Sequence, residues 1–288
     1  MPLSIPLLET RQAIKEMGST GHHPVQFLCN DDHIWFCKYV LDVEDPHQTD
    51  LLYYELIGTA LLRQLGITTP DVAFVRITED SFTPEQVPSN AKHMQPGVVA
   101  FGSKRMLGDV VDDLLYYRTA SEFSKLKNPE DLLRIALFDL WVANRDRGKE
   151  LWDRPGQHNY NLLQMPLPGG HRLVPIDHAS ILGDTLELRA FHPANLRLSV
   201  DGTLFQTRLC SSVMHHLGAE MRNRVLDDFL TSVSRTSPDD LFATIDSAKA
   251  HWEYPPGFDT RLSAFLWNAE RLARLEAEAR TFFQHPAP

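Results

Sequence analysis

Three oxygen-bearing side chains follow one another through the middle of the chain: Asp146, Asn161 and Asp177. Asp146 comes just after an apolar segment, Asn161 opens onto a pair of leucines, and Asp177 ends the apolar run LVPI. Carboxylate and amide oxygens are the hard donors that Mg²⁺ prefers, and a carboxylate can orient an attacking hydroxyl. This order fits phosphoryl transfer, in which Asp146 addresses the acceptor hydroxyl and the other two residues bind Mg²⁺.

A structural explanation exists for each of these residues taken singly, because Asp and Asn are the commonest turn and capping residues. The occurrence of all three in this order favours chemistry. His158 and Asn159 are alternatives for the polar residue at the end of the loop. Asn161 is preferred because it directly precedes the apolar pair Leu162-Leu163.

A lysine and a glutamate in the first third of the chain could serve the same chemistry. Lys38 lies in HIWFCKYV, where strand alternation places it on the same face as Ile34 and Phe36. Such a lysine either pairs with an anion or extends its ammonium to water at a sheet edge. Glu55, on the helix LLYYELIGTALLRQLG, is a candidate anion or a solvated residue at a helix edge. As a pair, Lys38 and Glu55 resemble the strand lysine and helix glutamate that hold nucleotide phosphates in kinases.

The elements that must position these residues change in type along the chain. The first third predicts strands around one helix. The expected strands are 24–28, 34–40, 72–77 and 98–101, the helix is 51–65, and residues 78–97 form a loop. We therefore expect an α+β fold with a β-rich N-lobe at residues 1–103 and a mainly helical C-lobe at residues 104–288.

The remainder of the chain predicts helices with clear start signals. At Asn128-Pro129 and at Ser237-Pro238, a capping residue precedes a proline and two acidic residues follow. The segment LLRIALFDLWVA is apolar on nearly every face, which indicates a central buried helix. A final amphipathic helix is expected over residues 262–283.

Composition is ordinary for a folded protein, with 288 residues, 43% hydrophobic and 23% charged residues, and a net charge of −10. We expect a cytoplasmic chain, since no signal peptide or membrane span is visible. Three cysteines without a C-x-x-C pair argue against a disulfide scaffold or a zinc ribbon. The acidic balance, with a pI near 5.7, argues against direct binding to nucleic acid.

Over about residues 18–182 the chain resembles the HipA-like kinases. The similarity rests on N-R-D-R after a buried helix, a later N-x-N-L-L, the apolar-P-I-D-H run, the strand lysine and the helix Y-E-L-I-G-x-x-L-L-R-x-L-G-I. This family has the protein-kinase-like fold, and a related branch includes the phosphatidylinositol kinases. The insertion GKELWDRPGQ lengthens the distance between Asp146 and Asn161 beyond that of the compact catalytic loop of protein kinases.

The resemblance implies an ATP- and Mg²⁺-dependent kinase whose acceptor is a protein Ser or Thr, or another small hydroxyl acceptor. It makes Lys38 the phosphate-binding lysine, Glu55 its ion-pair partner and Asp146 the catalytic aspartate. Asn161 and Asp177 become the metal ligands. The segment Gly18-Ser19-Thr20-Gly21 matches the place of the phosphate-covering loop, where the family modifies such hydroxyls. Any regulatory partner is expected to be a separate chain.

The sequence leaves two alternative functions open. A pseudokinase would keep the fold and act as a regulatory partner without turnover, and the complete set of five polar residues disfavours it. A metal-dependent hydrolase is suggested by the 13 histidines. No H-E-x-x-H motif occurs, and His215 and His216 are adjacent on an expected helix, where neighbouring side chains diverge.

Overall fold

The computed structural model describes residues 2–17, 23–40, 46–89, 93–111, 115–151, 154–183 and 198–284. Within these ranges the chain forms two compact units. The first contains residues 1–60, 70–106 and 239–256, and the second contains residues 61–69, 107–238 and 257–288. The boundary at residues 60 and 61 falls inside a single helix, α1.

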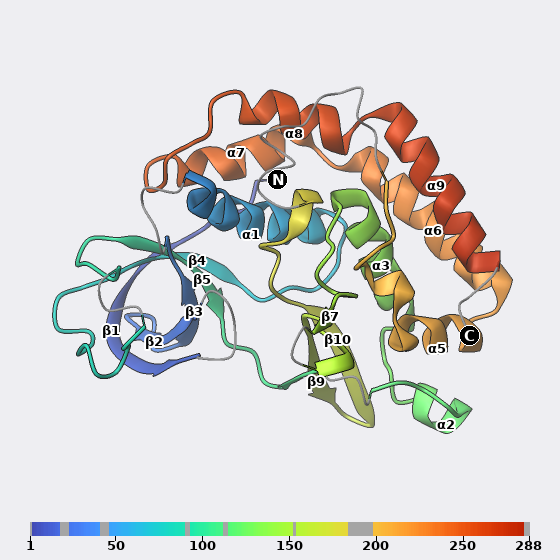
Figure 1. The fold of residues 1–288 in the computed structure, drawn as a ribbon, viewed down its shortest axis with the longest axis horizontal. Helices are drawn as coiled ribbons and strands as arrows, with labels where there is room; N and C mark the ends of the chain where they lie inside the picture. Colours follow the sequence, from blue (N-terminus) through green and yellow to red (C-terminus); the bar gives the residue numbers. More distant parts are fainter. Residues whose placement is uncertain are drawn as a thin grey trace. The chain divides into compact units, whose positions relative to one another are not determined.

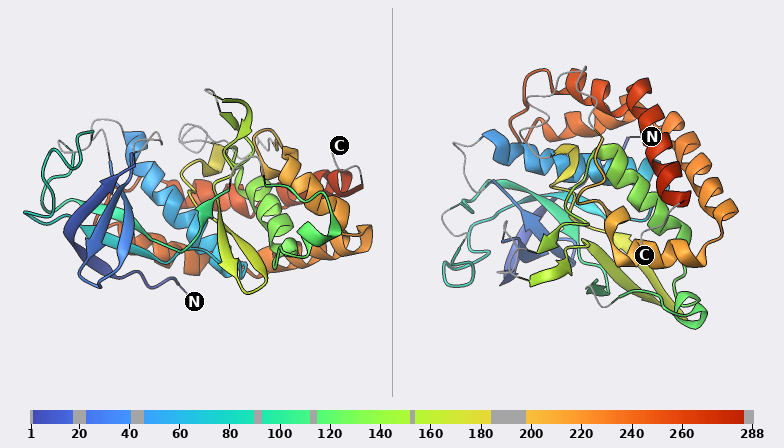
Figure 2. Two further views of the ribbon diagram at one scale, coloured as in Figure 1. Left: turned by 90° about the horizontal axis from the view of Figure 1, so that it is seen from below. Right: turned by 45° about the vertical axis from the view of Figure 1, so that its right-hand side comes forward.

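A closed five-stranded barrel forms the centre of the first unit, in dark blue to teal in Figures 1 and 2. The elements of this unit are β1 (Leu7–Glu16), β2 (Val25–Cys29), β3 (Ile34–Lys38), α1 (Pro46–Gln64), β4 (Val72–Arg76), β5 (Val99–Lys104) and α7 (Pro238–Ala248). The strand order is β1-β2-β3-β5-β4, and β1 closes the barrel by pairing parallel to β4.

Strand alternation divides β3 between the inside and the outside of the barrel. Trp35 and Cys37 are buried in the barrel core together with Phe27 and Val75. Lys38 therefore lies on the opposite face of the strand, as its alternation with Cys37 predicts.

The segment at residues 239–256 belongs to the first unit, although it lies far along the chain. Trp252 donates its indole N–H to the carbonyl of Val99 on β5 at 2.8 Å. The Tyr53 hydroxyl on α1 donates to the carbonyl of Trp252 at 3.1 Å, and the two rings meet edge to face. Trp252 thus ties α1 to the barrel.

The second unit is mainly helical. Its elements are β6 (Asp109–Val110), α2 (Ala120–Phe123), α3 (Pro129–Val142), β7 (Glu150–Leu151), β8 (Arg154–His158), β9 (Leu162–Leu167), β10 (Gly170–Pro175), η1 (Ile181–Gly183), η2 (Leu204–Gln206), α5 (Arg208–His216), α6 (Ala219–Arg235), α8 (Phe258–Leu266) and α9 (Ala269–Gln284). Helix α3 is its core, because residues 132–133 and 135–142 are all buried. Helices α6 and α9 lie side by side in Figure 1 and are joined by the Arg280–Asp227 ion pair at 2.8 Å.

A three-stranded antiparallel sheet in the second unit has the order β10-β9-β6. Leu162 pairs with Pro175, so the start of β9 lies beside the end of β10. Residues just before β9 and just after β10 are therefore brought together. These are the residues around Asn161 and Asp177.

The structure confirms an α+β chain and most of the expected elements: the hairpin of β2 and β3, the helix α1, the strand β4 and the buried helix α3. Strand β1 was not predicted. The described part of residues 78–97 forms no helix or strand, as expected. None of the described helices combines the length and apolar character needed to cross a membrane.

One local prediction was wrong, and the predicted start of α3 at Asn128-Pro129 was confirmed without a capping hydrogen bond from the Asn128 side chain. Residues 262–283 form two helices, because Trp267 turns away to donate its indole N–H to Thr236 at 2.9 Å and Asn268 caps the amide of Arg271. Asn128 precedes α3 but does not cap it with its side chain. Its amide group instead makes two hydrogen bonds with the backbone of Leu173 on β10, at 2.9 and 3.0 Å.

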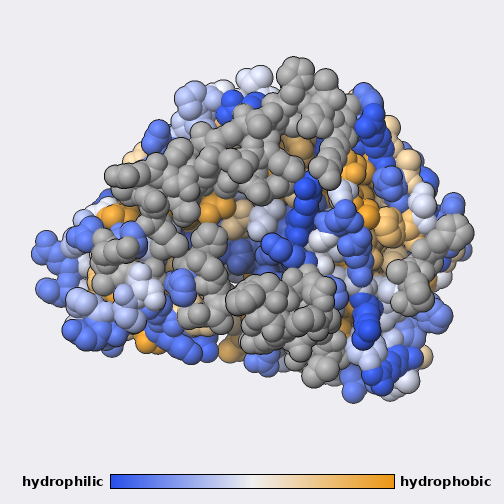
Figure 3. Space-filling model, in the orientation of Figure 1, coloured by the Kyte–Doolittle hydropathy of each residue, from blue (hydrophilic) through white to orange (hydrophobic). Residues whose placement is uncertain are grey.

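On the face drawn in Figure 3, apolar residues occur in small groups among hydrophilic ones. This distribution agrees with the charged composition of the chain. Four large hydrophobic side chains among the described residues are exposed, namely Leu7, Ile14, Leu107 and Val110. Scattered exposed residues of this kind are normal for a folded protein.

The three cysteines are expected to be unreactive in the native protein. Cys29, Cys37 and Cys210 are free and buried. Burial raises the pKa of Cys29 to about 12 and raises the pKa of the other two thiols as well. Because the thiolate is the nucleophile, a thiol reagent at mildly alkaline pH should label none of them until urea unfolds the chain. Rapid labelling of the native protein would contradict this packing.

Candidate active site

Lys38 and Glu55 form an ion pair within the first unit. The Lys38 ammonium donates to Glu55 Oε1 at 2.5 Å, and the side chains are 15% and 4% exposed. The pair joins strand β3 to helix α1. Of the two interpretations of Lys38, the structure shows the paired one. A pair this buried pays a desolvation cost, so its presence requires either good geometry or a function.

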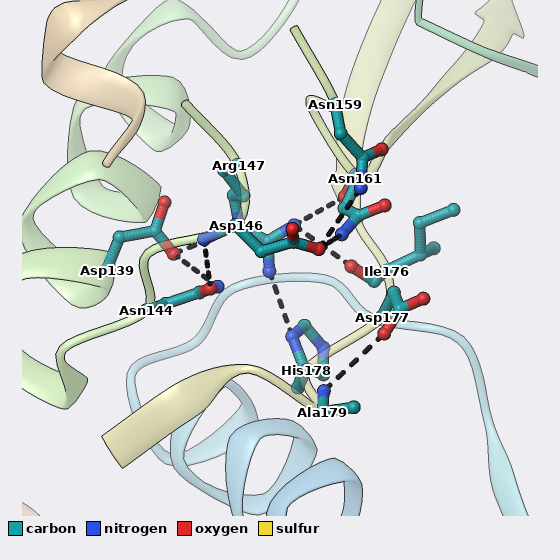
Figure 4. Close-up of polar contacts among 10 residues, drawn as sticks. All are labelled: Asp139, Asn144, Asp146, Arg147, Asn159, Asn161, Ile176, Asp177, His178 and Ala179. Carbon is teal, nitrogen blue, oxygen red and sulfur yellow. Dashed lines mark hydrogen bonds and ion pairs between the residues drawn. The ribbon is translucent and has the colours of Figure 1, made fainter. Parts of the chain in front are cut away.

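Asp146 lies in the loop that follows α3 and accepts hydrogen bonds from two asparagine amides. Asn161 donates to Asp146 Oδ2 at 2.7 Å, and Asn159 donates to the same oxygen at 3.1 Å. Figure 4 shows both amide groups turned towards this carboxylate. Of the three candidates that the sequence offered, His158, Asn159 and Asn161, the two asparagines therefore contact Asp146.

The pKa of Asp146 is raised above its usual value. Burial is the main cause, and the negative charge of Asp177 is the second. The hydrogen bond from Asn161 acts in the opposite direction. The charge of Asp177 thus acts on Asp146, and the structure brings together the three residues Asp146, Asn161 and Asp177 within the second unit.

Asn161 and Asp177 both adopt a left-handed backbone conformation, with φ of 45° and 55°. Asn and Asp adopt this conformation more readily than other non-glycine residues, but it still costs free energy relative to right-handed backbone, so surrounding contacts help to hold it. Asn161 precedes β9 and Asp177 follows β10. The two strained residues therefore flank the paired strand ends.

Arg147, next to Asp146, is fully buried and makes contacts in several directions. Its Nη1 donates to the carbonyl of Ile176 at 2.9 Å and to the carbonyl of Asn161. Its Nη2 lies 2.9 Å from Nδ1 of His178. A guanidinium can only donate, so this nitrogen of His178 is the acceptor.

The counter-charge of Arg147 is Asp139 on α3, which is also fully buried. Arg147 Nε donates to Asp139 Oδ1 at 3.0 Å, and the amide of Asn144 donates to the same oxygen at 3.0 Å. Asn144 in turn accepts the backbone N–H of Asp146 at 3.2 Å. Burial raises the pKa of Asp139 to about 6, and the charge of Arg147 opposes this shift.

Two glycines hold the loop of Asp146 against the segment that precedes η2. The N–H of Gly148 donates to the carbonyl of Gly202 at 2.6 Å. A Cβ at Gly148 would lie 2.0 Å from the carbonyl oxygen of Thr203, and one at Gly202 would lie 2.2 Å from that of Arg145. Since neither backbone can yield, these positions require glycine.

The donor set fits a magnesium ion. Asn161 directs its amide nitrogen to Asp146, so its carbonyl Oδ1 is the atom that a cation would use, and Asp177 offers a carboxylate. Mg²⁺ commonly takes one or two such protein ligands together with phosphate oxygens and water. Within the described ranges, no group of three or more His, Cys, Asp or Glu side chains is arranged to hold a metal. The hydrolase alternative gains no support there.

The expected phosphate loop, Gly18-Ser19-Thr20-Gly21, lies outside the described residues. Sequence reasoning missed the supporting groups Asp139, Asn144, Arg147 and His178. A signal for one of them was present, because Asp139 is the only acid inside the apolar segment LLRIALFDLWVA. A lone acid in such a segment must find a partner.

Comparison with protein families matches residues 12–206, more than half of the chain, to the HipA-like kinases. No curated protein matches the chain.

Among solved structures, the proinflammatory kinase CtkA of Helicobacter pylori is similar with a TM-score of 0.54 and 13% identity, covering 99% of this chain and 100% of that one. HipA of Shewanella oneidensis MR-1, solved with HipB and operator DNA, gives a TM-score of 0.48 and 15% identity over 93% of this chain and 67% of that one. The Golgi casein kinase with Mn/ADP bound gives a TM-score of 0.48 and 13% identity, covering 98% of this chain and 75% of that one. The similarity to CtkA indicates a kinase fold.

The Lys38–Glu55 pair predicts a non-additive effect on stability. Lys38→Met takes the ammonium from a buried carboxylate and should lower the free energy of unfolding by about 3 kcal/mol. The double variant Lys38→Met/Glu55→Leu should recover much of this loss, because apolar groups then replace both charges. Urea unfolding measures both. Lys15→Met, at an exposed lysine of β1, is the control and should change stability by about 0.5 kcal/mol or less. Additive losses in the double variant would contradict the pairing.

Proposed function

Because the chain belongs to the HipA-like kinase family, we propose that it transfers the γ-phosphoryl group of ATP to a hydroxyl acceptor. The observation that carries this proposal is the carboxylate of Asp146, held by the amides of Asn159 and Asn161 and close enough to Asp177 for its charge to raise the Asp146 pKa. Phosphoryl transfer needs mainly positioning and charge stabilisation, and this arrangement supplies both.

Each residue receives a role from the chemistry of its side chain. Asp146 orients the acceptor hydroxyl and accepts its proton. Its raised pKa makes the Asp146 carboxylate a stronger base than the carboxylate of an exposed aspartate. Lys38 binds nucleotide phosphates, and Glu55 holds its ammonium in place. The sequence places Gly18–Gly21 as the loop that covers these phosphates.

Asn161 and Asp177 would hold Mg²⁺ through Oδ1 and a carboxylate oxygen. When bound, the ion neutralises charge on the phosphates. We propose further that residues 1–103 and 104–288 supply the two lobes of a protein-kinase-like fold. Residues 61–69 and 239–256 are exceptions to this division, because each belongs to the other compact unit.

The acceptor is proposed to be a Ser or Thr of a protein, on the basis of family membership. A regulatory partner, if one exists, is a separate chain. HipA from Shewanella oneidensis was solved with HipB and operator DNA, which makes a binding partner worth testing here. We do not propose that the chain itself binds nucleic acid, because its net charge of −10 would repel the phosphate backbone.

A pseudokinase is the second candidate, because family membership fits an inactive relative too. The two functions differ in turnover and agree in fold. The presence of all five polar residues supports activity, because a protein without turnover does not need the complete set. These residues are Lys38, Glu55, Asp146, Asn161 and Asp177.

ATP with Mg²⁺ should stabilise the folded chain. A ligand that binds only the native state stabilises it by mass action, and millimolar nucleotide against a micromolar Kd gives about 4 kcal/mol. Thermal unfolding with ATP–Mg²⁺, with ATP and EDTA, and with Mg²⁺ alone should show the largest shift in Tm for the first. Unchanged melting at saturating ATP–Mg²⁺ would count against a nucleotide-binding protein of either kind.

Asp146 and Asp177 should fail in different ways. Asp146→Ala should reduce transfer by about 100- to 10,000-fold, the contribution of a general base, and should leave the Kd for ATP–Mg²⁺ nearly unchanged. Asp177→Ala should raise that Kd because it removes a metal ligand. Calorimetry and a transfer assay with radiolabelled ATP measure the two quantities.

Asp109→Ala, at an exposed aspartate of β6 in the same unit, controls for removal of a negative charge and should match wild type in both. Wild-type turnover in Asp146→Ala, or equal loss of binding in both site variants, would overturn the assignment of roles.

A further inference from the structure

We propose that Arg147, anchored by Asp139, is a positioning residue that sets the geometry of Asp146, Asn161 and Asp177. The inference rests on the proposed function for its catalytic meaning, but its structural content can be tested without catalysis. Arg147 itself is fully buried. Because its side chain is shielded from solvent, it acts through the backbone and side chains around the site.

Three separate parts of the site meet at the Arg147 guanidinium. The guanidinium of Arg147 reaches the carbonyl of Asn161, the carbonyl of Ile176 at 2.9 Å and Nδ1 of His178 at 2.9 Å. These three acceptors belong to a proposed metal ligand and to the two neighbours of the other, Asp177. Figure 4 shows the contacts running from one side chain to these separate stretches of chain. No other group described in the site connects all of them.

Arg147 also contacts the peptide groups at the two left-handed residues of the site. Asn161 and Asp177 adopt left-handed backbone conformations that surrounding contacts help to hold. Arg147 binds the carbonyl of Asn161 itself and the carbonyl of Ile176, which belongs to the peptide bond entering Asp177. The N–H of Ile176 also donates to the carbonyl of Asn161 at 2.9 Å. The guanidinium thus fixes both strained turns at their peptide groups.

Asp139 on α3 holds Arg147 in place. Asp139 accepts from Arg147 Nε at 3.0 Å and from the amide of Asn144 at 3.0 Å, and Asn144 accepts the backbone N–H of Asp146 at 3.2 Å. One buried carboxylate on the rigid helix α3 therefore orients Arg147 and, through Asn144, the backbone of Asp146. The planar fork of a guanidinium can satisfy several directions at once, whereas a lysine ammonium cannot reach them in the same geometry.

The test compares two buried arginines in the full chain. Arg147→Lys keeps the charge and removes the fork. Arg271→Lys is the matched control, because Arg271 on α9 is also buried and donates to backbone carbonyls, those of Trp141 and Leu140. Both variants should lower Tm. Only Arg147→Lys should raise the apparent Kd for Mg²⁺ in the presence of ATP, by about 10- to 100-fold, as removal of groups that orient metal ligands commonly does.

Amide hydrogen exchange without nucleotide supplies a readout independent of catalysis. Arg147→Lys should speed exchange in the peptides that contain residues 161–163 and 175–178, and Arg271→Lys should leave them at the wild-type rate. If Arg147→Lys does not fold, Asp139→Asn takes its place, because it keeps an oxygen acceptor and the shape while removing the counter-charge. We expect Asp139→Asn also to raise the apparent Kd for Mg²⁺ and to speed amide exchange in these two segments.

Wild-type Mg²⁺ affinity and wild-type exchange in Arg147→Lys would overturn the inference. Equal changes in both arginine variants would also overturn it, since they would indicate general destabilisation. If wild-type protein binds no ATP–Mg²⁺, the proposed function fails, and the exchange rates alone then decide whether Arg147 positions these segments.

Discussion

The buried ion pair between Arg147 and Asp139 is the constraint on which the second unit's site depends. A charged pair removed from water is costly unless hydrogen bonds compensate for the lost hydration. Here the remaining donors of Arg147 are taken up by backbone carbonyls and a side chain of the site itself. The cost of burying the charges is therefore tied to the geometry of the loop after α3 and of the ends of β9 and β10. Any change that loosens these segments also leaves a buried charge poorly solvated.

The first unit shows the same principle on a smaller scale. Lys38 projects from the outer face of a barrel strand and meets Glu55 on α1 at 2.5 Å. The helix is tied to the barrel by Trp252, through Tyr53 and the carbonyl of Val99. The position of Glu55 is thus supported by a segment almost two hundred residues away in sequence. In both units, a rigid helix carries an acid that orients a basic side chain.

Much of this could be predicted from sequence because it depends on local pattern. Alternation predicted that Lys38 shares one face of its strand with Ile34 and Phe36, and the order of Asp146, Asn161 and Asp177 indicated one site. The roles given to these residues remain predictions. What local pattern could not predict is set by distant contacts. The partners of Arg147 are mainly backbone carbonyls, which leave no trace in residue types, and the break at Trp267 depends on Thr236. The parallel pairing of β1 with β4 and the place of Trp252 have the same origin.

If this chain moves a phosphoryl group from ATP to a hydroxyl, the phosphate must become covalently attached to an acceptor. The most direct measurement is incubation of purified protein with γ-labelled ATP and Mg²⁺, alone and with a cell lysate, followed by mass spectrometry of the chain and of every labelled species. We expect Mg²⁺-dependent transfer of the label to a Ser or Thr hydroxyl, either on this chain or on a lysate protein. Binding of ATP with no label on any acceptor, or release of the label as free phosphate alone, would contradict it.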